Sequence, residues 1–282
     1  MSPARSPSAE PVHPRACVSA ICTFDLALDE DLAFWRRHGI GTAGVSVAKL
    51  ERFGWERGTE LVAEAVAGGL RVANLIGLGP FDLAAPESWP RQQERLVRSI
   101  ETASAVGAEC MVFTTGRFAP LTWEAAADNL ERALTPVLAD ARARGIPFAI
   151  EHTNSLRVDV GFVHSLRDAI DLARRLDAGV CMELNACWAE RALASTIRDG
   201  VDRIRLVQVS DFKVGTVASS QRLVPGDGDV PIARILRTLL DAGYAGVFDL
   251  ELIGDAIVAE GYDAAVPRAV DALGSILTEL GA

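Results

Sequence analysis

The chain has 282 residues, a formal net charge of −10 and a pI of about 5.0, and 49% of its residues are hydrophobic. This acidic balance argues against a nucleic-acid surface, which needs clustered Lys and Arg to neutralise phosphates. No segment reaches the roughly 18 apolar residues that a membrane span needs, and the five scattered cysteines form no CxxC pair. We therefore expect a cytoplasmic protein with a sizeable core and with no nucleic-acid or membrane partner.

The first segment, residues 1–15, is rich in Pro, Ser and Ala and has no apolar stretch of the kind found in secretory signals. Its composition predicts a disordered leader. Residues 16–282 contain no linker-like stretch. We expect this part to form one catalytic domain.

Short apolar runs bounded by Gly or polar residues recur from residue 16 onward, as expected for strands buried in a parallel sheet. They cover residues 16–21, 41–47, 70–79, 109–115, 146–152, 178–184, 204–210 and 246–252. The stretches between them have helical spacing of apolar residues. One such helix, residues 123–145, contains Pro136, where we expect a kink or a break. Pro231 is expected at the first position of another helix.

Eight strands alternating with eight helices indicate βαβ units, and this number and length match a single (β/α)₈ TIM barrel of about 250 residues. The alternative is an open, doubly wound sheet. Such a sheet would normally carry a Gly-rich phosphate loop after its first strand, whereas residues 21–30 contain no glycine. The pattern therefore favours the barrel.

The polar residues at the ends of the later strands suggest a site, because barrel enzymes place their chemistry at the carboxyl ends of the strands. Glu151 ends the fifth strand, Glu183 the sixth and Glu251 the eighth, and Gln208 lies near the end of the seventh. Carboxylates about 4 Å apart repel by roughly 4 kcal/mol at an effective dielectric of about 20. A divalent cation such as Mg²⁺ or Mn²⁺ would offset this repulsion. Gln208, otherwise an unexplained amide in a core strand, would then be a neutral ligand.

Four segments carry a family resemblance: FAIEH (148–152), VCMEL (180–184), LVQVSDFK (206–213) and residues 222–252, which include PGDGD. Together they resemble the sugar phosphate isomerase/epimerase family, the xylose-isomerase-like barrels. Members of that family bind a metal through Glu after strand five, Asp or Glu after strand six, His or Gln after strand seven and Glu after strand eight.

The resemblance implies that the metal ligands here are Glu151, Glu183, Gln208 and Glu251, with Mn²⁺ favoured and Mg²⁺, Co²⁺ or Zn²⁺ as alternatives. It also implies that Glu151 and Glu251 are the catalytic acid and base that form an enediolate from a sugar-like hydroxy-ketone. Many relatives carry, three residues after the strand-six ligand, a His that touches substrate; this sequence has Ala186 there. The substrate pocket is therefore not that of a standard ketose epimerase.

Four further residues are candidates for substrate contact. His152 follows a presumed ligand, and its alternative is a structural histidine. Arg222 and Lys213 lie in the segment after strand seven, where each could instead be an exposed loop residue. Trp188 could stack on a ring or simply fill the barrel rim.

The leading hypothesis is a metal-dependent isomerase or epimerase of a sugar, ketose or polyol-derived ketone. The closest alternative uses the same site for elimination, as a dehydratase of inosose or dehydroshikimate type or a lyase of sugar conjugates. A DNA-repair enzyme like endonuclease IV needs a His-rich zinc site and a basic face, which four His and a charge of −10 disfavour. A non-catalytic binding subunit would have lost its ligands. By resemblance, the partners are a small polar substrate and other copies of the chain, in a homodimer or homotetramer.

Overall fold

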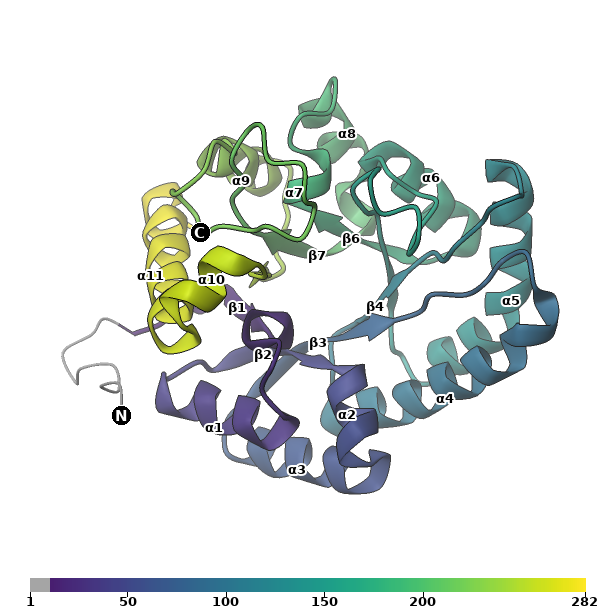
Figure 1. The fold of residues 1–282 in the computed structure, drawn as a ribbon, viewed down its shortest axis with the longest axis horizontal. Coiled ribbons are helices and arrows are strands. Elements are labelled where there is room, and N and C mark those ends of the chain that lie inside the picture. The colour runs from purple at the N-terminus through teal and green to yellow at the C-terminus, as the bar shows by residue number, and fades with distance from the viewer. Residues whose placement is uncertain (1–10) are drawn as a thin grey trace.

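The computed structural model describes residues 11–282. Eight parallel strands form a closed barrel in chain order, and helices surround it (Figure 1). The predicted single TIM barrel is confirmed, and every strand lies inside one of the predicted apolar runs. The strands are β1 Ala16–Ser19, β2 Thr42–Ser46, β3 Arg71–Leu78, β4 Met111–Thr114, β5 Phe148–Glu151, β6 Gly179–Glu183, β7 Ile204–Val209 and β8 Phe248–Leu250.

The helices connect successive strands and pack on the outside of the barrel. The α-helices are α1 Leu28–Arg37, α2 Val47–Phe53, α3 Trp55–Ala67, α4 Trp89–Val106, α5 Trp123–Ala143, α6 Leu166–Leu176, α7 Leu184–Cys187, α8 Leu193–Gly200, α9 Ile232–Asp241, α10 Asp255–Glu260 and α11 Tyr262–Leu280, and the 3₁₀-helices are η1 Ala20–Thr23, η2 Pro86–Ser88 and η3 Val201–Arg203. Helix α5 runs without a break through Pro136. Pro231 lies one position before α9, as its N-cap rather than its first residue.

Apolar side chains fill both the barrel interior and the layer between strands and helices. The interior cluster consists of Cys17, Ala73, Ile76, Cys110, Val112, Ala149, Cys181, Leu206 and Val247. All five cysteines are buried and free. Successive side chains along a strand point alternately into and out of the barrel. The inward-facing positions therefore continue from this cluster toward the carboxyl end of the barrel.

Part of the predicted leader lies on the barrel. Residues 1–10 are outside the described part of the chain. Arg15 donates from Nε to the Gly246 carbonyl at 2.9 Å, and its guanidinium lies 5.0 Å from the centroid of the Phe248 ring. His13 contacts the carbonyl of Ala282 at 3.2 Å. The packed chain therefore begins before residue 16. Within residues 11–282, no helix has the length and apolar content needed to cross a membrane.

Candidate metal centre

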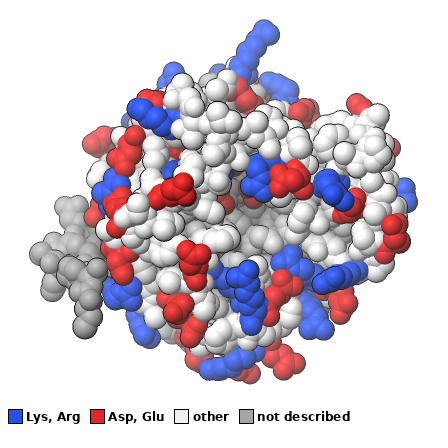
Figure 2. Space-filling model, in the orientation of Figure 1, with Lys and Arg blue, Asp and Glu red and all other residues white. Residues whose placement is uncertain are grey.

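Three glutamates meet at the carboxyl end of the barrel. Glu151 ends β5, Glu183 ends β6, and Glu251 directly follows β8. One carboxylate oxygen from each lies within 4.8 Å of the others. The three side chains line a cavity of about 290 Å³, here called the mouth. Figure 2 shows a hollow near the middle of this face, with charged side chains of both signs around it.

Glu183 is the most firmly held of the three. It is 2% exposed, and its Oε1 accepts from the backbone N–H of Asn185 and contacts Nη1 of Arg222, both at 2.8 Å. Burial alone would raise the pKa of Glu183, but Arg222 and the hydrogen bonds to the carboxylate hold that pKa below its usual value. Its other oxygen, Oε2, is buried without a hydrogen-bond partner. Glu183 is therefore an ionised carboxylate with one free oxygen.

The other two glutamates hold protons more readily. Burial, followed by the charge of Glu183, raises the pKa of Glu151 to about 7. The same two causes raise the pKa of Glu251 well above its usual range. Their environments thus separate the three carboxyls into one with a lowered pKa, Glu183, and two with raised pKa values, Glu151 and Glu251.

This donor set fits a divalent cation. Carboxylate oxygens bind Mg²⁺, Mn²⁺ or Zn²⁺ at about 2.0–2.2 Å. Three oxygens within 4.8 Å of one another could therefore bind one ion after small side-chain shifts. The buried, unpartnered Oε2 of Glu183 is an open ligand position. Among the described residues, these three glutamates are the group of His, Cys, Asp or Glu side chains spaced to hold an ion.

Gln208 lies in the barrel interior beside this group. It pairs in register with Glu183 on one side and Asp249 on the other, and it is fully buried. Its Oε1 accepts from the Cys181 thiol at 3.1 Å, while Nε2 has no partner. The two ends of an amide are assigned from hydrogen bonding. A flip would let Nε2 donate to the sulfur and leave Oε1 free as a ligand.

Of the four residues expected to contact substrate, Arg222 lines the mouth. His152 is fully buried, and burial lowers its pKa to about 4. Its Nε2 accepts from the backbone N–H of Glu183 at 3.3 Å, so the neutral ring supports β6. Lys213 pairs with Asp229 at 3.1 Å. Trp188 is half-buried against the core. None of these three residues lines the mouth.

The loop after β7 is built on Asp211, which explains the PGDGD motif. Its carboxylate accepts backbone N–H groups from Gly226 at 2.8 Å and from Val230 at 3.0 Å. A Cβ atom at Gly228 would lie 2.2 Å from Oδ1 of Asp211, so only glycine fits there. Asp211 therefore fixes the loop that carries Arg222.

Sequence reasoning missed the apolar side of the mouth. Ile21 and Phe24 come from the segment after β1, Leu78 and Pro80 from the end of β3, and Ile253 from the segment after β8. Phe24 is 53% exposed although it is a large apolar residue. That exposure is a property of the folded chain, and no periodicity in the sequence signals it.

A buried ion pair supports this apolar side. Nζ of Lys49 donates to the carbonyls of Ala20 and Thr23 at 3.0 and 2.8 Å, and to Oδ2 of Asp31 at 2.7 Å. Lys49 is 6% exposed and Asp31 is fully buried. The pair ties helices α1 and α2 to η1, the turn that carries Ile21.

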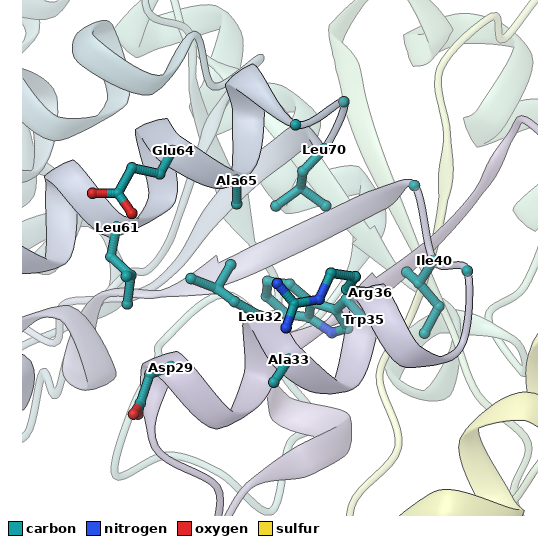
Figure 3. Close-up of a pocket in the computed structure, with 14 residues that line it drawn as sticks. Asp29, Leu32, Ala33, Trp35, Arg36, Ile40, Leu61, Glu64, Ala65 and Leu70 are labelled. Atoms are coloured by element: carbon teal, nitrogen blue, oxygen red, sulfur yellow. The ribbon is translucent and has the colours of Figure 1, made fainter. Parts of the chain in front are cut away.

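A larger cavity, of about 600 Å³, lies in the helical layer between α1 and α3. Figure 3 shows Leu32 and Trp35 on one side of it and Leu61 and Ala65 on the other. It lies away from the carboxyl ends of the strands and does not include the glutamate cluster. We therefore place the candidate site at the mouth.

The chain belongs to the xylose isomerase-like TIM barrel family, whose sequence model matches residues 32–274. Among curated proteins, none matches the sequence significantly. The family assignment confirms the resemblance inferred from the strand-end motifs.

Solved structures share the whole fold at low sequence identity. The protein SMc04130 from Sinorhizobium meliloti has a TM-score of 0.78 and 21% identity, covering 94% of this chain and 98% of its own. The IolI protein, solved with a bound zinc atom, has a TM-score of 0.81 and 16% identity, with the same coverage. D-psicose 3-epimerase from Clostridium cellulolyticum, solved with D-tagatose, has a TM-score of 0.71 and 14% identity, covering 95% and 98%.

Proposed function

We propose that this protein is a divalent-metal-dependent isomerase or epimerase of a sugar, ketose or polyol-derived ketone. The observation that carries the proposal is the convergence of Glu151, Glu183 and Glu251 at the open end of the barrel, with oxygens within 4.8 Å of one another. Two structurally similar proteins are consistent with it: IolI, solved with a bound zinc atom, and D-psicose 3-epimerase, solved with D-tagatose.

The three glutamates would have two different roles, metal anchoring and proton transfer. Glu183, ionised and oriented by Arg222 and the Asn185 N–H, is the fixed anchor for the ion. The ion would polarise a substrate carbonyl and stabilise negative charge next to it. Glu151, with a pKa of about 7, and Glu251, with a raised pKa, can take up and return a proton at a carbon adjacent to that carbonyl. Gln208 is proposed as the fourth ligand, with its amide flipped.

A second candidate function is supported by the apolar side of the mouth. A small polyol has hydroxyl groups on all sides. Those facing Ile21, Phe24 and Ile253 would find no hydrogen-bond partner in these apolar side chains. In a sugar-like group joined to an apolar portion, the hydroxyl groups would face the glutamates and the apolar portion would contact the apolar side of the mouth. The same proton abstraction would then lead to elimination, with cleavage of a sugar conjugate or loss of water.

Solvent exchange tests both functions together. The protein, supplied with Mn²⁺ in D₂O, is incubated with ketoses, inososes and sugar conjugates, and products are followed by mass spectrometry. Incorporation of deuterium with no other mass change supports isomerisation or epimerisation. A new product lacking water or the apolar group supports elimination. Absence of exchange across these classes would contradict the proposed chemistry.

A further inference from the structure

The acidic centre contains a cation supplied by the chain itself. Nη1 of Arg222 lies 2.8 Å from Oε1 of Glu183 and 3.8 Å from Oε2 of Glu251. The side chain is only 13% exposed, and its Nε has no partner. The guanidinium thus bridges two of the three carboxylates that are proposed to hold the metal.

The backbone around Arg222 fixes this placement. Its own N–H donates to the carbonyl of Ile253 at 2.8 Å, beside the strand end that carries Glu251. The next residue, Leu223, exchanges two backbone hydrogen bonds of 2.9 Å with Asp211. Nη1 also donates to Oγ of Ser210 at 3.2 Å. The guanidinium is therefore held at the centre from both sides of the mouth.

Charge balance gives this arrangement a consequence. Metal ligands must be deprotonated. With all three glutamates ionised the centre would carry −3, and Arg222 would reduce this to −2, the charge that one divalent ion neutralises. An ion bound near Glu183 and Glu251 would lie within a few ångströms of the guanidinium, and the two cations would repel. Arg222 and the metal thus stabilise the same carboxylates and compete for them.

We propose that Arg222 is the resident counter-ion of the centre. It holds the carboxylates together when no metal is bound. It also weakens metal binding, because an incoming ion must either displace the guanidinium or bind beside its positive charge. This inference rests on the proposed metal centre. Arg222 is accordingly a positioning residue. Its removal should lower the stability of the metal-free protein and raise the affinity for the metal.

The variant Arg222→Gln tests this, since Gln loses the charge and keeps a polar side chain at this position. Arg222→Lys keeps the charge. Arg157→Gln is the matched control, because Arg157 lines the same mouth but is already paired with Asp159 at 2.9 and 3.0 Å. Mn²⁺ affinity is measured by calorimetry at pH 8, and thermal unfolding is measured in EDTA and in saturating Mn²⁺.

The expected result for Arg222→Gln is a metal-free Tm lower by several degrees, recovery in Mn²⁺, and Mn²⁺ binding roughly tenfold tighter or more. Arg222→Lys should bind within about threefold of the wild type, as should Arg157→Gln. If Arg222→Gln folds only when Mn²⁺ is present, the proposal is supported in its extreme form. If it folds neither with nor without Mn²⁺, the residue is merely structural and the proposal is overturned.

Two further outcomes separate this inference from the proposed function. If wild type and Arg222→Gln bind Mn²⁺ with equal affinity, or the variant binds more weakly, the counter-ion role is wrong and the metal centre stands. If the wild type binds no divalent ion, both are wrong.

Discussion

Replacing Lys49 with Met should destabilise the protein strongly, because it leaves the Asp31 carboxylate buried without its partner. Nζ of Lys49 makes four hydrogen bonds of 2.7–3.0 Å, two to Asp31 and two to backbone carbonyls of η1. Removing one partner of a buried pair costs about 3–5 kcal/mol. For a domain of this size each kcal/mol lowers Tm by about 2–4 °C, so we expect a decrease of roughly 10 °C.

Urea and thermal unfolding of the purified variant measure this effect. The control is Lys213→Met, which breaks the exposed pair with Asp229 and should cost less than about 1 kcal/mol. The double variant Lys49→Met/Asp31→Leu should recover much of the loss, because no charge then remains buried. A loss for Lys49→Met no larger than for Lys213→Met would refute the reasoning.

Three more predictions follow from the site. For a ketose into which the wild type exchanges deuterium, Glu251→Gln should reduce the exchange rate by about 10²-fold or more, because it removes a proton-transfer group. Exchange retained by the variant in the mass-spectrometric assay would exclude a proton-transfer role for Glu251. Asp211→Ala should cost about 3 kcal/mol in urea unfolding, since the loop N–H groups of Gly226 and Val230 lose their acceptor; an unchanged midpoint would contradict the loop's dependence on this carboxylate. Burial raises the pKa of Asp249 from 3.8 to about 7, so between these values the native state holds a proton that the unfolded state releases. Asp249 alone should therefore lower stability in EDTA by up to about 1.4 kcal/mol per pH unit between about pH 4 and 7, and should add no slope at higher pH. Asp249→Asn should remove this part of the slope, and an identical slope in thermal unfolding would count against it.

The barrel and its acidic residues could be predicted from the sequence because both depend on local pattern. Short apolar runs with Gly or polar boundaries define buried parallel strands, and a barrel places all their carboxyl ends at one face. Glu151, Glu183 and Glu251 each lie at or just after such an end. Their convergence follows from the fold class, without knowledge of any particular contact.

The surroundings of these residues depend on tertiary placement and could not be predicted. His152 follows Glu151 directly, yet it is fully buried, contacts the backbone of β6 and does not line the mouth. Arg222 reaches the centre because Asp211 folds its loop back across the mouth. Lys49 and Asp31 lie on different helices, and nothing in their local sequence indicates that they form a buried pair.

The divalent metal ion proposed at the mouth is tested most directly by elemental mass spectrometry of the purified protein. The wild type, as isolated or after incubation with excess Mn²⁺ and desalting, is compared with Glu151→Ala/Glu251→Ala. We predict about one divalent ion per chain in the wild type and essentially none in the variant. A wild type that retains no ion after loading, or a variant that retains as much as the wild type, would contradict the claim.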